Sequence, residues 1–149
     1  KLEDWPLLLD WRNDEETRKN SHTTEPVAEA SHKTWLTKVL SDPNTQLHIA
    51  EEGGIPVGTV RADYHESQND YLLSWTIAPH ARGKGIGTLL MNQLIEEAKT
   101  KELKGIVWQV LDWNEKAIQF YEKYASSFDS EWINCSLTTE QINSSNASI

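Results

Sequence analysis

The sequence predicts a mixed α/β (α+β) fold in which helices flank a mixed central sheet. Amphipathic segments with helical spacing alternate along the chain with short runs rich in branched and aromatic residues. The resulting order is α-α-β-β-β-α-β-α-β, with no internal repeat and no long linker. At 149 residues the chain is expected to form a single domain, residues 1–149, that ends in a polar tail from about residue 138.

Two helices are expected at the start of the chain. Asp4 is followed by a tryptophan, a proline and spaced apolar residues, which is typical of a capped helix, here about residues 5–17. Residues 19–25 are polar and predict a loop. After Pro26 apolar residues recur at helical spacing until the Ser-Asp-Pro-Asn segment at 41–44, where proline ends the second helix.

Three strands are expected next, and two more later in the chain. In residues 46–64, QLHIAEEGGIPVGTVRADY, two branched runs flank Glu-Glu-Gly-Gly, which indicates a β-hairpin. Residues 71–77, YLLSWTI, are apolar on both faces and predict a central strand. The runs IVWQVL, at 106–111, and SEWINCSL, at 130–137, predict the remaining strands.

Two further helices are expected, one before the strand at 106–111 and one after it. Apolar residues from Ile86 onward share one helical face, which predicts a helix over residues 86 to about 100 that Gly105 brings to an end. Asn114 is a suitable N-cap for a helix whose alanine and aromatic residues recur at i, i+3, i+4 and i+7.

Composition excludes several classes of function. The net charge of -9 argues against nucleic acid as a partner, because its phosphates would be repelled. No apolar run approaches the ~18 residues of a membrane span. Cys135 is the single cysteine, so a disulfide within the chain is impossible and a cytoplasmic location is expected. The histidines show no metal-ligand spacing, so no metal site is expected.

The segment Ala78–Gly87, APHARGKGIG, holds three of the seven glycines at alternate positions, with an arginine before them and a lysine among them. It joins a predicted strand to a predicted helix, so the unpaired amides of the first helical turn and the helix dipole favour an anion there. A P-loop is excluded because Lys84 precedes Gly85, and a dinucleotide fingerprint fits poorly because Thr88 stands where its last glycine belongs. A plain glycine-rich turn is the alternative to a phosphate-binding loop.

The run Arg82-Gly83-Lys84-Gly85-Ile86-Gly87 resembles the R/Q-x-x-G-x-G/A loop of the GNAT N-acetyltransferase superfamily, which binds the pyrophosphate of acetyl-CoA. Residues 110–128, VLDWNEKAIQFYEKYASSF, resemble the second signature of that family and, locally, the diamine N-acetyltransferases. The segments WRNDEETRKNS and SHKTWL are similar to bacterial members that acetylate amino sugars. The likeness covers roughly residues 4–137 and implies the GNAT acyl-CoA N-acyltransferase fold, with its usual first strand missing.

The resemblance also implies the residues that hold acetyl-CoA. Strand-end groups offer their backbone to the pantetheine arm, and the loop amides hold the diphosphate. Beside the resemblance, Asn114 can bond the pantetheine amides as well as cap its helix, and Lys123 can reach a phosphate, with a solvated surface lysine as the alternative. These cofactor-binding residues are Thr76, Ile77, Arg82, Gly83, Lys84, Gly85, Ile86, Gly87, Thr88, Asn114 and Lys123.

Tyr121 is the candidate general acid, since a phenol can protonate a departing thiolate of comparable basicity. A core aromatic is the alternative, because Tyr121 shares the apolar stripe of its helix. The base that deprotonates the amine has no motif. Asp63 and His65, at the end of the hairpin, are the catalytic candidates, followed by the loop residues His22 and Glu25, and an ordinary surface role is the alternative for all four.

The sequence therefore predicts an acetyl-CoA-dependent N-acetyltransferase that acts by direct attack of a primary amine in a ternary complex. No activated Cys or Ser motif supports a covalent acetyl-enzyme. The expected acceptor is a small molecule, an amino sugar ahead of a polyamine; a protein N-terminus or lysine, or a non-catalytic CoA-binding module, is the alternative. No nucleic-acid or membrane partner is expected, and a homodimer is compatible with the sequence.

Overall fold

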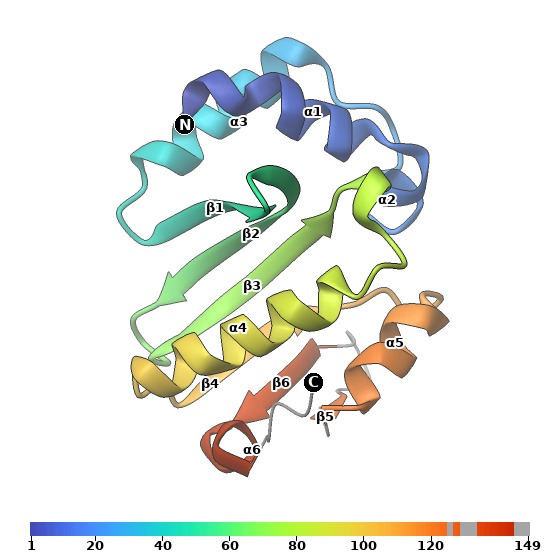
Figure 1. The fold of residues 1–149 in the computed structure, drawn as a ribbon. Coiled ribbons are helices and arrows are strands. Elements are labelled where there is room, and N and C mark those ends of the chain that lie inside the picture. Colours follow the sequence, from blue (N-terminus) through green and yellow to red (C-terminus); the bar gives the residue numbers. More distant parts are fainter. Residues whose placement is uncertain (125–126, 129–133, 145–149) are drawn as a thin grey trace. The chain divides into compact units, whose positions relative to one another are not determined.

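The computed structural model describes residues 1–124, 127–128 and 134–144 (Figure 1). It forms two compact units, each described by itself: Lys1–Asp63 with Trp75–Ile86, and Tyr64–Ser74 with Gly87–Ile149. The helices are η1 Leu2–Asp4, α1 Trp5–Asn13, α2 Glu15–Lys19, α3 Glu29–Ser41, η2 Pro79–Ala81, α4 Ile86–Thr100, α5 Glu115–Glu122 and α6 Thr139–Ser144. The strands are β1 Thr45–Glu52, β2 Ile55–His65, β3 Asp70–Ile77, β4 Gly105–Gln109, β5 Ser127–Phe128 and β6 Asn134–Thr138.

The first unit opens with two short helices where the sequence predicted one helix over residues 5–17. Helix α1 ends at Asn13 because Asp14 adopts an extended backbone, with ψ of 139°. Its side chain then caps α2, accepting a hydrogen bond from the Thr17 amide at 3.0 Å. An aspartate satisfies the unpaired amides of a helix start better than it continues a helix, which explains the break.

Helices α1 and α3 pack together and build the apolar core of the first unit. Leu8 and Trp11 of α1 are buried, as are Leu36 and Val39 of α3. Helix α3 also contacts strand β1. His32 of α3 is the buried polar residue of this core, with 4% of its surface exposed.

The predicted hairpin is confirmed as β1 and β2. The strands pair antiparallel from Thr45 opposite Asp63 to Glu52 opposite Ile55. Gly53 and Gly54 form the turn with φ of 59° and 79°. Two consecutive positive φ values suit the tight turn that matches the twist of paired strands, and glycine adopts them without strain.

Strand β3 is central, as expected, in the strand order β1-β2-β3-β4-β6-β5. In the second unit β3 pairs parallel with β4, and Tyr71 lies opposite Ile106. Strand β6 pairs antiparallel with both β4 and β5. The predicted helices at 86–100 and after Asn114 are confirmed as α4 and α5.

The C-terminal part differs from the expectation of a polar tail. Helix α6 forms over residues 139–144, packs on β6, and buries Ile142 to 1% exposure. Strand β5 was not predicted, because it spans two residues. The predicted last strand, 130–137, begins at Asn134 in the described chain, and its residues 130–133 lie outside the described residues.

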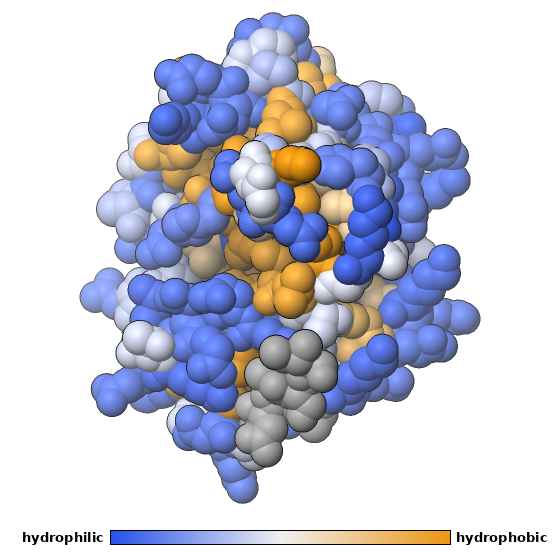
Figure 2. Space-filling model, in the orientation of Figure 1, coloured by the Kyte–Doolittle hydropathy of each residue, from blue (hydrophilic) through white to orange (hydrophobic). Residues whose placement is uncertain are grey.

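Hydrophilic side chains cover most of the face shown in Figure 2, in keeping with the acidic, polar composition. None of the described helices combines the length and the apolar character that crossing a bilayer requires.

Candidate functional site

The glycine loop joins β3 to α4 (Figure 1). After β3 the chain passes first through η2 and then through the glycines, before α4 begins. Gly83 and Gly85 have φ of 71° and 82°, and an added Cβ at either position would meet no atom within 4 Å. These positions therefore require glycine for its backbone conformation, since the surrounding space is open. Both glycines and Lys84 between them are exposed, so the loop backbone is accessible to a ligand.

The first turn of α4 has the backbone amides and the partial positive charge that are typical of the start of a helix. Ile86 is buried at 3% exposure and fixes the start of the helix, whereas Thr88 in the same turn is exposed. The first amides of an α-helix have no partner within the helix, and the dipole places partial positive charge there. Within the described chain Lys84 makes no ion pair. The predicted phosphate-binding loop is therefore exposed and carries Lys84, a cation that has no ion pair within the described residues.

The other cation of the loop points elsewhere. The Arg82 guanidinium lies 2.6 Å from Asp14 Oδ2 and 3.3 Å from Glu16 Oε2, on α2 and its cap. Its charge is matched by carboxylates of the first unit. The backbone of Arg82 stays a predicted cofactor contact, and its side chain is oriented toward α2.

Close packing between β2 and the end of β3 fixes the position of Thr76 and Ile77. A Cβ added at Gly58 would lie 2.6 Å from the Thr76 carbonyl oxygen. The Ala78 amide donates to the Val57 carbonyl at 2.9 Å. Sequence reasoning missed Gly58, although an isolated glycine inside a strand pattern is the signal of a close backbone approach.

Tyr121 lies on α5 with its ring in the core of the second unit. It is 8% exposed, and its ring centroid lies 5.2 Å from that of Trp108. Burial, followed by the nearby Cys135, raises the pKa of Tyr121 far above its ordinary value. The phenol is therefore protonated in the free protein, but the raised pKa makes it a weaker acid than the ordinary phenol that the comparison with a thiolate assumes.

The start of α5 is built as the sequence predicted. The Asn114 side chain accepts a hydrogen bond from the Ala117 amide at 3.2 Å, which makes it the N-cap. Lys123 is exposed just beyond the last residue of the helix. Neither position tests a contact with the cofactor.

The first turn of α4 lies against α5. An added Cβ at Gly87 would lie 3.9 Å from Phe120 Cζ, an ordinary contact. Burial raises the pKa of Tyr124, and a hydrogen bond with the Thr88 side chain partly offsets that increase. Tyr124 Oη also donates to Asn92 Oδ1 at 3.3 Å. The structure thus brings two predicted loop residues next to the helix that carries Tyr121.

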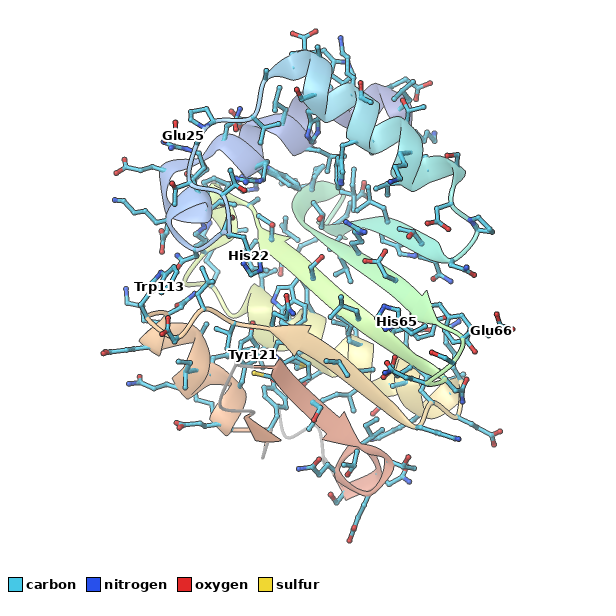
Figure 3. The ribbon with its side chains drawn as sticks, turned by 180° about the vertical axis from the view of Figure 1, so that it is seen from behind. His22, Glu25, His65, Glu66, Trp113 and Tyr121 are labelled. Atoms are coloured by element: carbon cyan, nitrogen blue, oxygen red, sulfur yellow. The ribbon has the colours of Figure 1, made fainter. Side chains whose placement is uncertain are left out.

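The two hairpin candidates for the base lie toward the far end of β2. Both Asp63 oxygens are engaged, since Oδ1 accepts from Thr45 Oγ1 at 2.7 Å and Oδ2 lies 2.9 Å from Arg61 Nη2. His65 Nδ1 lies 3.3 Å from Asp70 Oδ1 at the turn between β2 and β3. Figure 3 shows His65 at this turn and Tyr121 on α5, so these two side chains of the second unit are not brought together.

The other two candidates lie on the segment between α2 and α3. His22 and Glu25 are exposed there (Figure 3). Trp113, just before α5, is 63% exposed, whereas Trp108 is in the core at 1%.

The chain matches the model of the acetyltransferase (GNAT) family over residues 5–125, which is most of its length. It therefore belongs to the acetyltransferase (GNAT) family. This agrees with the resemblance of the glycine loop and of the tyrosine helix.

Two curated relatives are similar over part of their length. L-ornithine N5-acetyltransferase of Arabidopsis thaliana is 36% identical over 61 residues, which are 41% of this chain and 27% of that protein. L-2,4-diaminobutyric acid acetyltransferase of Shouchella clausii is 30% identical over 96 residues, 63% of this chain and 54% of that protein. The matched region thus spans about a quarter to a half of these relatives.

Solved structures with the same fold cover nearly the whole chain. Spermidine N-acetyltransferase from Vibrio cholerae, in complex with CoA and spermine, has a TM-score of 0.83 at 16% identity over 95% of this chain and 93% of that one. Aminoglycoside acetyltransferase AAC(6')-Ib, in complex with coenzyme A, has a TM-score of 0.79 at 19% identity over 96% and 94%. The predicted GNAT fold class is confirmed.

Proposed function

We propose that the chain is an acetyl-CoA-dependent N-acetyltransferase that acetylates a primary amine of a small molecule by direct attack in a ternary complex. One observation supports this above the others. The strand-to-helix loop of this GNAT chain presents two exposed glycines with positive φ at the start of a helix. That arrangement suits a diphosphate, because backbone amides are accessible where the helix dipole is positive.

The residues of the loop fit the diphosphate by charge as well as by shape. Amides of Gly83 to Thr88 would hold it, and Lys84 would supply the formal charge. Thr76 and Ile77 would offer backbone groups to the pantetheine arm, together with Asn114, and Lys123 would reach a phosphate. Acetyl-CoA supplies the thioester whose acyl carbon the amine attacks.

The proposed reaction forms a carbon–nitrogen bond and breaks a carbon–sulfur bond. The amine must first lose a proton to a base, and the departing thiolate sulfur must gain one. Tyr121 is the proposed acid, because it is the tyrosine of the helix that resembles the second family signature; the cofactor complex must then lower its raised pKa toward that of the thiolate. Cys135 gives no support for a covalent route, since it is buried and burial raises its pKa to about 11.

Four side chains are candidates for the base that deprotonates the amine. Asp63 and His65 remain candidates, although Arg61 and Thr45 engage the Asp63 carboxylate and Asp70 lies beside His65. A carboxylate that already accepts charge-assisted hydrogen bonds is a weak proton acceptor. His22 and Glu25, which are exposed on the segment between α2 and α3, are the other candidates.

The acceptor that we propose is a small molecule with a second amino group. The names of the relatives specify ornithine and 2,4-diaminobutyric acid, and those of the structural neighbours spermidine and an aminoglycoside. Each of these molecules carries more than one amine. A net charge of -9 suits such a cationic acceptor. A cytoplasmic location is part of the proposal.

Thiol release from acetyl-CoA tests this function. We expect amine-dependent release with at least one acceptor from a panel of ornithine, 2,4-diaminobutyrate, spermidine, an aminoglycoside and glucosamine. Turnover only with a peptide N-terminus or a peptide lysine would replace the small acceptor with a protein. Acetyl-CoA binding without turnover on any amine would contradict an enzyme and favour a CoA-binding module.

A further inference from the structure

The Arg82 side chain joins the glycine loop to a helix that is far away in sequence. Its Nη2 donates to Asp14 Oδ2 at 2.6 Å and to Thr17 Oγ1 at 2.8 Å, and its Nη1 donates to Glu16 Oε2 at 3.3 Å. The Arg82 and Asp14 side chains are 26% and 23% exposed. A partly buried pair of this kind is screened less by solvent and salt than a surface pair.

The same pair completes the start of α2. Asp14 Oδ2 also accepts from the Thr17 amide at 3.0 Å and from the Thr17 hydroxyl at 3.2 Å. The hydrogen bond from Arg82, followed by that from the Thr17 amide, holds the pKa of Asp14 below its ordinary value. A five-residue helix gains little stability from its own backbone, so these side-chain contacts hold α2 in place.

Helices α1 and α2 in turn hold the segment that follows them. Arg18 Nη1 donates to the Thr24 carbonyl at 2.7 Å, and Arg12 Nη2 donates to the Thr23 carbonyl at 2.9 Å. Asn13 exchanges two hydrogen bonds with the backbone of Val27, at 2.8 and 2.9 Å. The segment 20–28 contains no helix or strand, and side chains of α1 and α2 hold its backbone carbonyls.

We propose that Arg82 is a positioning residue that couples ligand binding at the glycine loop to the order of residues 14–27. A diphosphate bound to the loop amides limits the motion of the Arg82 backbone. The Arg82 guanidinium, which holds α2, is then also limited in its motion. Segment 14–27, which bears the exposed His22 and Glu25, is then more ordered when acetyl-CoA is bound. By linkage, an acceptor that orders this segment binds more tightly to the acetyl-CoA complex. This inference rests on the proposed function, since acetyl-CoA is the ligand.

The opposite possibility is that Arg82 leaves Asp14 and binds a phosphate of the ligand. Two variants separate the two roles. Asp14→Asn keeps a good N-cap for α2 and removes the charge that holds Arg82. Lys84→Gln removes the cation that makes no ion pair in the described chain, and it leaves the Arg82 contacts intact.

Hydrogen–deuterium exchange of the full chain, with and without saturating acetyl-CoA, measures the coupling directly. In the unsubstituted protein we expect acetyl-CoA to slow exchange in peptides covering residues 14–27. Asp14→Asn and Arg82→Gln should lose most of that protection and weaken acetyl-CoA binding by only a few-fold. Lys84→Gln should weaken binding by about tenfold and keep the protection at saturation.

Wild-type protection of residues 14–27 in Asp14→Asn would overturn the coupling. So would a loss of affinity in Arg82→Gln as large as that in Lys84→Gln, because Arg82 would then contact the ligand. Glu16→Gln, which touches Arg82 at the longer distance, is the milder variant should Asp14→Asn unfold, and it should lose part of the protection. If the unsubstituted chain binds no acetyl-CoA, the proposed function fails; if it binds without protecting 14–27, only the coupling fails.

Discussion

Single residues of the glycine loop are selected by backbone conformation. Gly85 has φ of 82° with open space around it, whereas Gly87 lies in α4 with no positive φ. Glycine at position 85 is therefore explained by its backbone conformation, whereas the backbone conformation at position 87 does not explain a glycine.

Gly85→Val should lower the free energy of unfolding by about 1–3 kcal/mol, because a β-branched residue is strained at this φ. If the loop relaxes instead, acetyl-CoA affinity should fall. Chemical denaturation and calorimetric binding measure the two effects. Gly87→Ala is the matched control and should be at least as stable as the original protein, since alanine favours helix and meets Phe120 at an ordinary distance. A Gly85→Val protein with unchanged stability and affinity would refute the role of the loop.

Tyr121 and Tyr124 offer a matched test of the general acid on one helix. Tyr121→Phe should lower kcat by about 10²-fold or more while the affinity for acetyl-CoA stays the same, since only the acidic proton is removed. Tyr124→Phe removes a phenol that donates to Asn92 and should keep most of the turnover. Steady-state kinetics with varied acetyl-CoA separates the effect on kcat from the effect on acetyl-CoA affinity. Equal losses of kcat and affinity in Tyr121→Phe would mean that Tyr121 is a packing residue.

At the scale of elements, the contact between α1 and α3 contains a pH-sensitive group. Burial, followed by the charge of Arg12, lowers the pKa of His32. Among the described residues, His32 Nε2 and Arg12 Nη1 have no hydrogen-bond partner. The unfolded chain therefore binds a proton before the folded chain does. The free energy of unfolding should fall as the pH drops below about 6.5, by at most about 1.4 kcal/mol per pH unit.

Urea unfolding of the protein between pH 7.5 and 5 measures this dependence. His32→Leu should flatten it across that range, because the titrating group is gone. A His32→Leu variant with the same pH dependence would assign the effect to other groups.

The packing of β2 on the end of β3 gives a second prediction at this scale. Gly58→Ala should cost about 1–3 kcal/mol, because its Cβ would lie 2.6 Å from the rigid carbonyl of Thr76. Thermal unfolding measures the cost, and Gly87→Ala again serves as the control. A neutral Gly58→Ala would show that the two strands separate easily.

The elements that the sequence predicted well are those with a local signal. Helix α4 begins and ends as expected, since its apolar stripe follows a glycine loop, and Asn114 marks the start of α5 through its cap. The break at Asp14 was missed because an aspartate in a helical pattern is compatible with either continuation or capping. Helix α6 was missed because a polar segment hides a single buried residue, Ile142.

At the scale of the whole molecule, the sequence could not predict contacts between distant segments. Arg82 and Asp14 are separated by 68 positions, and no local pattern links them. Arg82 stays a predicted cofactor-binding residue of the motif, and the structure places its guanidinium beside Asp14 and Glu16. The family, the loop and the tyrosine helix were identified from short motifs, because their chemistry depends on residues that are adjacent in the chain.

The central claim is that backbone amides from Gly83 to Thr88 bind the diphosphate of acetyl-CoA. A crystal structure of the chain grown with acetyl-CoA tests it most directly. We expect diphosphate density within hydrogen-bond distance of those amides, with Lys84 close by and Arg82 still on Asp14. Diphosphate density at any other part of the chain would contradict it.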